Sequence, residues 1–535
     1  MLSAFFIDYS YYFVFFMFLS WLYQGASCYG ESLKNLVIRD WRWLLGAFVI
    51  TTLLFVSINV DYKVLSDETN LFSVARCFSA FQKTANNTLG VFYYETYHPL
   101  LLEAPTRPLL FPFLASLLNL LIGTSDRNPL ILNFLLTGLF LYAASLWHGE
   151  EKKRFRYFAY LGVAASPVFS IHATSAGFDV CSILFGILSF YALRAYLADA
   201  GNRQKLSFLV LSILCFASVR YESLLLLPLF LGAAFWVRRG KLLSDFVSTP
   251  ALLVTPVYLV PLILQRIVTW GHFENPPGIA PFSVQAATNH FPIFLQQFFT
   301  ASATPYLSIF HWFGLASIFL FFRSRRKIRL EEIVLLISFL ILFAIMLAHH
   351  MGIASHPTQV RLFLPFSMVL VLMGATWLGT VKLPKLILPI FYAVALLEAV
   401  VGHSYAVRDP LLSQLILTRE THYLRAWMRD HKSNLAEAPL LVYDRPGQFT
   451  AFGYGAVDYD YFRSHMESFK QNLRDGLYSE VYIIQHRSFF DGKIHLEDQV
   501  SNTLALVELA HFEVSEVDEV VVSKLEHPVR LPPKL

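Results

Sequence analysis

The sequence predicts an all-α polytopic membrane bundle of about 12 transmembrane helices with juxtamembrane helices, followed by a small external α/β domain. The first supporting observation is composition: 56% of the residues are hydrophobic and only 15% are charged, whereas soluble proteins have roughly 25% charged residues. The second is that apolar runs of about 20 residues, the length that crosses a bilayer, recur through the first 400 residues. The third is a change to alternating helix-like and strand-like patterns after residue 403.

Composition and charge also exclude several classes of protein. With 25 Gly, 25 Pro and a mean hydropathy of +0.50, the chain is neither collagenous nor disordered. Its four cysteines show no disulfide framework and no zinc-binding spacing. The net charge of +4 is small, and the basic residues are segregated into particular loops, so no nucleic-acid partner is expected.

Twelve apolar segments are the predicted spans. They are residues 4–22, 43–60, 129–147, 157–173, 180–198, 206–220, 222–237, 246–264, 305–322, 330–348, 362–380 and 386–402. The first segment lacks a basic region before it and a small-residue cleavage site after it, which indicates a retained helix and not a signal peptide. We therefore predict a transmembrane domain over 1–402, with a long external loop at 60–128, and an external α/β domain over 403–535.

Lysine and arginine predict the orientation. Alternate loops carry the basic clusters, at Lys34/Arg39/Arg42, Lys152/Lys153/Arg154/Arg156, Arg203/Lys205, Arg238/Arg239/Lys241, Arg323/Arg325/Arg326/Lys327/Arg329 and Lys382/Lys385. The positive-inside rule makes these loops cytoplasmic, so both chain ends, the other loops and the C-terminal domain are external. The protein is then a multi-pass protein of the plasma or inner membrane. The short apolar segment 108–123 would reverse this pattern if it crossed, so we assign it to a membrane-embedded or interfacial helix.

The C-terminal region predicts a small fold with its own core. Helical patterns occur at 417–432, 459–474 and 504–512, and apolar strand-like runs occur at 440–443, 481–485 and 520–522. Alternation of this kind is typical of α/β domains. The region has no GxGxxG or P-loop motif, so no nucleotide is assigned to it.

Ionisable residues in the predicted external turns are the candidate functional groups, because such residues are costly at membrane depth. Asp67 and Glu68 follow the second span and open an amphipathic helix, and Asp179 lies in a very short turn without a basic neighbour in sequence. The alternatives are that Asp67 and Glu68 only complement a helix dipole and that Asp179 is a solvated loop acid.

Basic and polar residues in the same turns are the candidate substrate contacts. Arg107 precedes Pro108 at the entrance of segment 108–123, Arg220 and Glu222 occupy one turn, and His350 and Arg361 occupy another. A helix entrance with an adjacent arginine suits an anion. The alternatives are an arginine that contacts lipid headgroups, a local ion pair at Glu222, and a hydrogen-bonded structural histidine.

Carboxylates and arginines around an external cavity suit a reaction on a lipid-linked anion. When a sugar leaves a polyprenyl phosphate, the phosphate is already ionised and needs no acid. The reaction then needs a carboxylate that accepts the proton of the acceptor hydroxyl and fixed cations that hold the departing phosphate. The loop 265–304, with Pro276-Pro277-Gly278, could cover such a site.

The order of these motifs resembles the GT-C fold of integral-membrane glycosyltransferases, particularly the protein-mannosyltransferase and lipid A aminoarabinose-transferase type. The resemblance rests on Asp67-Glu68-Thr69, Arg107-Pro108-Leu109, Ser166-Pro167 followed by Asp179, Arg220-Tyr221-Glu222 and Arg361–Pro365, and covers about residues 43–400. It implies that Asp67 is the catalytic base and that Glu68 contacts the acceptor or a metal. It also implies that Arg107 and Arg361 hold the lipid phosphate and that Asp179 orients the substrate or a divalent ion.

We therefore expect an inverting glycosyltransferase of cell-envelope glycosylation that uses a polyprenyl-phosphate sugar donor. Its acceptor is a lipid, a glycan or a protein. Membrane lipids surround the enzyme. The catalytic candidates are Asp67, Glu68 and Asp179; the substrate-binding candidates are Arg107, Arg220, Glu222, His350 and Arg361. A divalent cation, Mg²⁺ or Mn²⁺ on Asp67 or Asp179, is the one cofactor suggested. The alternatives are a lipid-linked glycan transporter or flippase, which would place charges near the bilayer midplane on broken helices, and an assembly subunit.

Overall fold

A computed structural model describes most of the chain. The described residues are 1–93, 96–147, 153–238, 241–270, 280–300, 306, 308–323, 330–381, 387–411, 415–431, 439–475, 480–490, 493–496, 504–515 and 518–526. They form two compact units. The first comprises Met1–Tyr62 and Pro108–Pro410, and the second comprises Lys63–Arg107 and Leu411–Leu535. Residues 63–107, which we expected within an external loop of the transmembrane domain, thus belong to the second unit.

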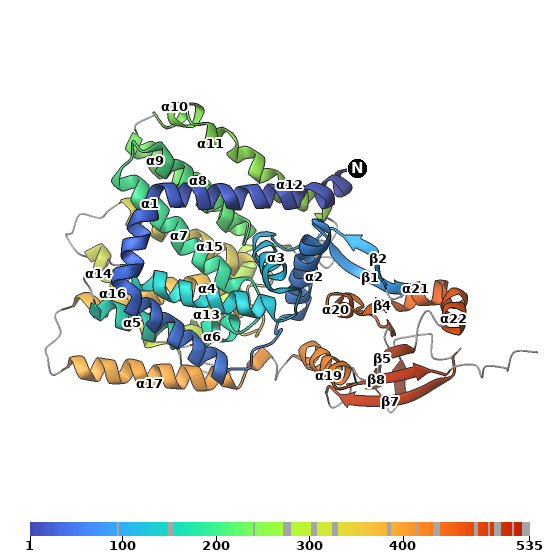
Figure 1. Cartoon of the computed structure of the whole chain (residues 1–535). Helices are drawn as coiled ribbons and strands as arrows, with labels where there is room; N and C mark the ends of the chain where they lie inside the picture. The colour runs from blue at the N-terminus through green and yellow to red at the C-terminus, as the bar shows by residue number, and fades with distance from the viewer. Residues whose placement is uncertain are drawn as a thin grey trace, which may run out of the picture. The chain divides into compact units, whose positions relative to one another are not determined.

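The first unit is helical (Figure 1). In the part of the chain that the structure describes, eight helical segments are long and apolar enough to cross a membrane. They are Leu2–Glu31, Ile38–Ser57, Asn128–Ser145, Asp179–Ala198, Tyr221–Arg238, Leu330–Ala348, Val360–Gly379 and Leu388–Val407. Each coincides with a predicted span, so the prediction of an integral membrane protein with a helical bundle is confirmed.

The first two spans belong to one helix. Helix α1 runs over Leu2–Ser57, and Asp40 has non-helical backbone angles that mark a kink within it. Figure 1 shows α1 changing direction along its course. The loop expected between residues 22 and 43 is therefore wrong: the segment contains no proline, and Gly25 and Gly30 weaken a helix without ending it.

The remaining predicted spans are shorter or broken. Helix α8 (Arg203–Ala217) and α14 (Ile309–Arg323) have 15 residues each. The segment 157–173 divides into α5 (Lys153–Ala164) and α6 (Pro167–Ala173). The segment 246–264 divides into the short pieces α10 (Leu242–Val247), α11 (Pro250–Leu253), η2 (Thr255–Leu259) and α12 (Val260–Val268). Prolines at the start of α6, α11, η2 and α12 explain the breaks, because proline lacks the N–H that continues a helix.

Two further helices lie in the predicted external loops. Helix α3 (Leu110–Ile122) has 13 residues, so it is about 20 Å long and too short to cross a hydrocarbon core of about 30 Å. Helix α13 (Val284–Phe299) was not predicted, and Pro276-Pro277-Gly278 lies outside the described residues. The other elements near the candidate site are α4 (Asn128–Ser145), α7 (Asp179–Ala198), η1 (Tyr221–Leu225), α9 (Leu226–Arg238), α15 (Leu330–Ala348), η4 (Val360–Phe363), α16 (Leu364–Thr380) and α17 (Leu388–Val407).

The second unit is built on an eight-stranded sheet with the order β2-β1-β4-β3-β5-β8-β7, and β6 pairs with β5. Figure 1 labels β1, β2, β4, β5, β7 and β8. Its strands are β1 (Asn86–Tyr93), β2 (Thr96–Glu103), β3 (Leu440–Val442), β4 (Gly455–Val457), β5 (Val481–Phe490), β6 (Lys493–Leu496), β7 (Leu506–Glu513) and β8 (Asp518–Leu525). Strands β4, β3 and β5 are parallel, whereas β8 pairs antiparallel with β5 and β7.

Helices pack on both faces of this sheet. Leu424, Trp427 and Met428 of α19 (Ile416–Asp430) share one buried cluster with Leu441 of β3. Residues of α21 (Tyr459–Ser464) and α22 (Met466–Arg474) share another with Leu440 of the same strand. Adjacent residues of β3 therefore face opposite layers, as the pleat of a strand requires. The remaining helices of the unit are α2 (Leu65–Phe81) and α20 (Gly447–Thr450).

Two features of the second unit differ from the prediction. Residues 504–512 were expected to be helical, but β7 occupies Leu506–Glu513, where Ala510 pairs with Val522 and Phe512 with Val520. Pairing with a β-branched neighbour has overridden the helical propensity of Leu, Ala and Glu. The β1–β2 hairpin was not predicted either; its strands extend the C-terminal sheet through the pair Gly90–Ala456.

Candidate active site

The structure brings the predicted residues together in two groups, one in each unit. In the first unit, Asp179 is the centre of a buried charged cluster at the start of α7. Arg220 Nη2 lies 3.9 Å from Asp179 Oδ1, and Arg361 Nη1 lies 3.8 Å from Asp179 Oδ2. The side chain of Asp179 is 2% exposed, and those of Arg220 and Arg361 are 9% and 12% exposed. Three residues far apart in sequence thus form one electrostatic group, with the arginines partly shielded from solvent.

Two neighbours that were not predicted complete this cluster. His172 of α6 is buried, and its Nδ1 lies 3.8 Å from Asp179 Oδ2. The ring of Phe178 has the guanidinium carbons of Arg220 and Arg361 each 6.0 Å from its centroid, within cation–π range. Among the described residues, neither oxygen of Asp179 has a hydrogen-bond partner, so the carboxylate acts on these groups through charge.

Asn133 of α4 holds the turn that precedes Asp179. Its Nδ2 donates to the carbonyl oxygens of Ser175, at 2.6 Å, and Gly177, at 2.7 Å. Asn133 is fully buried. A buried amide that satisfies two backbone carbonyls fixes their position, because the alternative leaves both without partners. The start of α7 is therefore set by a contact from another helix.

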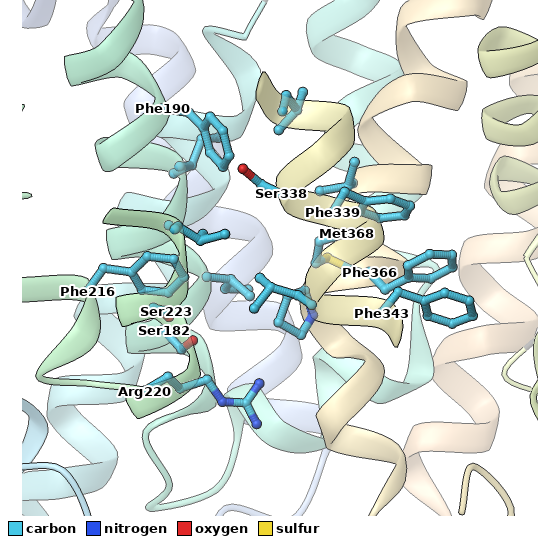
Figure 2. Close-up of a pocket in the computed structure, with 18 of the residues that line it drawn as sticks. Ser182, Phe190, Phe216, Arg220, Ser223, Ser338, Phe339, Phe343, Phe366 and Met368 are labelled. Atoms are coloured by element: carbon cyan, nitrogen blue, oxygen red, sulfur yellow. The ribbon is translucent and has the colours of Figure 1, made fainter. Parts of the chain in front are cut away.

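A cavity begins beside this cluster and extends between α7, α9, α15 and α16. It contains about 1030 Å³ of space between its lining atoms, part of it open to the outside. Figure 2 shows Arg220 at one end and Phe190 at the other, with Phe216, Phe339 and Phe366 between them. Glu222 also lines the cavity. The lining is otherwise mostly apolar, which suits a long hydrocarbon ligand with an anionic end.

In the second unit, Asp67 and Arg107 form an ion pair. Arg107 Nε donates to Asp67 Oδ1 at 2.7 Å, and Arg107 Nη2 lies 2.5 Å from the same oxygen. The Asp67 side chain is 3% exposed, whereas that of Arg107 is 38% exposed. Both residues were predicted as site residues, and their direct contact was not. Arg107 therefore fixes the position of Asp67 Oδ1.

Glu68 fixes the beginning of α2. Its Oε2 accepts a hydrogen bond of 2.7 Å from the backbone N–H of Lys63, and the carbonyl oxygen of Lys63 accepts from Thr418 of α19 at 3.2 Å. A carboxylate bound to the backbone at a helix start stabilises that turn. The structure therefore gives Glu68 a positioning function beside Asp67.

The contacts of His350 that the structure describes are with Pro281 and His349, outside the Asp179 cluster. Its backbone N–H donates to the carbonyl oxygen of Pro281, and its ring centroid is 4.6 Å from that of His349. Burial lowers the pKa of His349, and the nearby charge of His350 lowers it further, while Glu222 opposes this effect. Glu222 therefore lies within electrostatic range of the histidine pair as well as lining the cavity.

The donor sets do not fit a divalent cation well. Three basic side chains surround Asp179, and Asp67 is already bound to Arg107, so each carboxylate has a cationic partner. Within the described ranges, no group of three His, Cys, Asp or Glu residues has an arrangement that could hold a metal ion. Mg²⁺ prefers several oxygen ligands in an octahedral arrangement. No step of the proposed reaction is therefore assigned to a metal.

Comparison with known proteins shows a likeness in structure. No family model matches the sequence, and no curated protein matches it. The structure of ArnT from Cupriavidus metallidurans bound to undecaprenyl phosphate has a TM-score of 0.56 and 13% identity, and the match covers 91% of this chain and 98% of that one. The apo structure of the same protein has a TM-score of 0.55 and 14% identity, with coverages of 92% and 98%.

A second solved protein is more distant. AglB, the oligosaccharyltransferase of Archaeoglobus fulgidus, has a TM-score of 0.47 and 10% identity, with coverages of 87% and 75%. At these identities the ArnT structures establish the fold alone. The resemblance predicted from the ordered motifs is confirmed at that level: the chain has the GT-C fold of ArnT, a lipid A aminoarabinose transferase, over nearly its whole length.

Proposed function

We propose that this protein is an inverting glycosyltransferase that moves a sugar from a polyprenyl-phosphate donor to an acceptor hydroxyl at the external membrane face. The observation that supports this most strongly is the apolar cavity with Arg220 at one end, beside the buried cluster of Asp179 and Arg361. A polyprenyl phosphate has the same division, with a long apolar chain and one anionic end. ArnT, which shares the fold, binds undecaprenyl phosphate in its crystal structure, and this supports the same donor class here.

The arginines suit the departing phosphate. As the bond between the sugar C1 and the phosphate oxygen breaks, negative charge accumulates on the phosphate. Guanidinium groups that are already in place stabilise this charge without reorganisation. Asp179 lies 3.8–3.9 Å from one nitrogen of each arginine and holds them near each other in the absence of the donor. It is therefore a positioning residue in this proposal.

The acceptor side of the reaction needs a base. The acceptor oxygen attacks the sugar C1, its proton passes to a carboxylate, and the polyprenyl phosphate leaves as an anion, so atoms and charge balance. We assign the carboxylate to Asp67, because Arg107 fixes its position and Glu68 fixes the turn that presents it. The external position of the site is supported by the positive-inside rule, which places the Lys- and Arg-rich segments on the cytoplasmic side.

Replacing Asp67 tests the assignment. In Asp67→Asn the acceptor proton has no carboxylate to receive it, so we expect transfer to fall by at least about a hundredfold. Binding of undecaprenyl phosphate should remain. Transfer is measured with a labelled polyprenyl-phosphate sugar in proteoliposomes, and binding with the purified variant in detergent. Glu467→Gln, which removes an exposed acid from the same unit, is the control.

Two results would contradict the proposal. Turnover by Asp67→Asn at the wild-type rate would remove Asp67 from the role of base. Counterflow of the lipid-linked sugar in proteoliposomes, without formation of a glycosidic bond, would support a transporter instead.

A further inference from the structure

Ser182 is a buried hydroxyl that lines the cavity. It lies in α7, its side chain is inaccessible to solvent, and its Oγ has no hydrogen-bond partner among the residues that the structure describes. Serines within helices commonly bond to the carbonyl oxygen four residues earlier, and Ser189 of the same helix does so with Phe185. Buried hydroxyls normally have partners, so an unpartnered one in a cavity wall is free to bond to a ligand that places a polar group beside it.

Ser182 lies at the charged end of the cavity. It follows Asp179 by three positions in the same helix, so the two side chains share a face of α7. Asp179 is in turn 3.9 Å from Arg220 Nη2. Figure 2 shows the Ser182 hydroxyl beside the Arg220 side chain, with both at the same end of the cavity. A group held by Arg220 inside the cavity is therefore within the neighbourhood of Ser182.

We propose that Ser182 donates a hydrogen bond from Oγ to a phosphate oxygen of the polyprenyl phosphate that Arg220 binds. This inference rests on the proposed function and adds a residue to its phosphate site. A phosphate monoester has several acceptor oxygens, and one guanidinium cannot satisfy all of them. A hydroxyl donor binds an anionic phosphate oxygen more strongly than the oxygen of an alcohol, so it favours the phosphate over the alcohol at the end of the same chain.

Ser338 provides a matched control in the same cavity. Its hydroxyl is also buried, lines the cavity and lacks a hydrogen-bond partner within the described residues. It belongs to α15, and Figure 2 shows it near Phe190, at the end away from Arg220. The two serines are thus equally buried, and within the described residues each has a hydroxyl without a hydrogen-bond partner. They differ in which end of the cavity they line, because only Ser182 lies at the end with Arg220.

The test compares two ligands of equal chain length. Affinities of the purified full chain in detergent are measured for undecaprenyl phosphate and for undecaprenol, which lacks the phosphate. We expect Ser182→Ala to lower the affinity for undecaprenyl phosphate about tenfold, as for a hydrogen bond to a charged group, and to leave undecaprenol binding unchanged. Ser338→Ala, at the apolar end, should leave the ratio of the two affinities as in the wild type, and Ser182→Thr, which keeps a hydroxyl, should restore most of the loss.

The outcomes separate this inference from the proposed function. If the wild type binds undecaprenyl phosphate no better than undecaprenol, the donor class itself is wrong. If the wild type discriminates and Ser182→Ala discriminates equally well, only the Ser182 contact is overturned. An equal loss for both ligands in Ser182→Ala, or the same change of the affinity ratio in Ser338→Ala, would show a packing effect and would also overturn it. Thermal unfolding of each variant confirms that the protein compared is folded.

Discussion

At the scale of single residues, Asn133 of α4 fixes the turn that precedes Asp179 at the start of α7. It binds the carbonyl oxygens of Ser175 and Gly177, and the chain reaches Asp179 two residues later. Asp179 needs a fixed position, because its distances of 3.8–3.9 Å to His172, Arg220 and Arg361 depend on it. Asn133 is therefore expected to be a positioning residue for Arg220 and Arg361, the arginines proposed to bind the phosphate.

Asn133→Ala tests this role against a matched variant of the same helix. Asn128 is also buried, and its Nδ2 also makes two hydrogen bonds, to Asn119 Oδ1 and the carbonyl oxygen of Gly123, both at 2.7 Å. Each alanine variant should lose about 1–3 kcal/mol of unfolding free energy. Only Asn133→Ala should also lower the affinity for undecaprenyl phosphate. Equal affinities in the two variants would limit Asn133 to a structural role.

The sequence alone predicted the residues of this group that stand out chemically. Asp179, Arg220 and Arg361 are charged residues in otherwise apolar stretches of sequence. Because burying a charge at membrane depth costs free energy, such residues are candidates for a functional site. His172 and Ser182 could not be singled out in the same way, because one polar residue in an apolar helix usually has a structural partner. For Ser182, the one indication in the sequence is its position three residues after Asp179, which places both on one face of a helix. The contact between Arg107 and Asp67 could not be predicted from the sequence, because the two residues are 40 positions apart and only the fold brings them together.

At the scale of elements, the kink of α1 is tied to a neighbouring helix by a buried ion pair. Arg156 of α5 donates from Nη2 to Asp40 Oδ2 at 2.8 Å, and its side chain is 1% exposed. The guanidinium carbon also lies 5.1 Å from the ring centroid of Trp43. A kink releases backbone groups from their helical partners, so side-chain contacts at that point stabilise its direction.

Removing one partner of this pair should be more harmful than removing both. Asp40→Ala leaves a buried guanidinium without its carboxylate, which costs about 3–5 kcal/mol. Asp40→Ala combined with Arg156→Met removes the buried charge, so the double variant should be more stable than the single one. Thermal unfolding in detergent measures both. Equal unfolding temperatures for the single and double variants would show that the pair is not coupled.

Helix α19 is joined to the sheet of the second unit by a titratable contact. Tyr443 donates its hydroxyl to Glu420 Oε1, and His486 Nε2 lies 3.2 Å from the same oxygen and 3.7 Å from Asp444 Oδ1. Burial raises the pKa of Glu420 above its ordinary value, and the opposing charge of His486 limits the rise; Arg445 and Asp444 have smaller effects. The folded unit therefore retains the proton of Glu420 to a higher pH than the unfolded chain does.

This raised pKa predicts a pH dependence with a defined sign. Below the ordinary pKa of glutamic acid, folded and unfolded chains are both protonated at Glu420, and its contribution to stability is complete. As the pH rises, the unfolded chain loses the proton first, so the free energy of unfolding falls until the pH passes the raised pKa. Glu420→Gln should remove this fall, and Glu467→Gln, at an exposed position, should keep it.

Hydrogen exchange of peptides from α19 and β3 in the full chain, followed from about pH 4 to about pH 8, measures the effect. A wild-type pH dependence in Glu420→Gln would contradict it.

Elements were predictable where local pattern and tertiary context agree. Long apolar runs gave the eight spanning segments, because a bilayer requires the same property along the whole helix. The predicted helix at 504–512 and the missed β1–β2 hairpin failed for the opposite reason, since their structure depends on pairing with distant strands. Proline positions indicated the breaks near residues 166 and 250 only once the pieces were seen to be separate helices.

For the whole molecule, the chain path assigns the proposed catalytic and binding residues to different units. The chain leaves the first unit after Tyr62, contributes Lys63–Arg107 to the second, and returns at Pro108. Asp67 and Arg107 thus belong to the second unit, whereas Arg220 belongs to the first. The proposal requires the second unit to be external, and the basic residues of the first unit to be cytoplasmic.

Cysteine labelling tests this arrangement in sealed membrane vesicles. Lys34 represents the basic side and Glu467 the second unit, and both side chains are exposed. The native thiols Cys77, Cys181 and Cys215 are buried, so Cys28→Ser gives a background with little reactivity. In that background, Glu467→Cys should react with a membrane-impermeant maleimide in right-side-out vesicles, and Lys34→Cys should react in inside-out vesicles. The parent protein without added cysteines is the control. Labelling of both positions in the same vesicles would contradict the topology, because it would place the basic segment of α1 and the second unit on one side of the membrane.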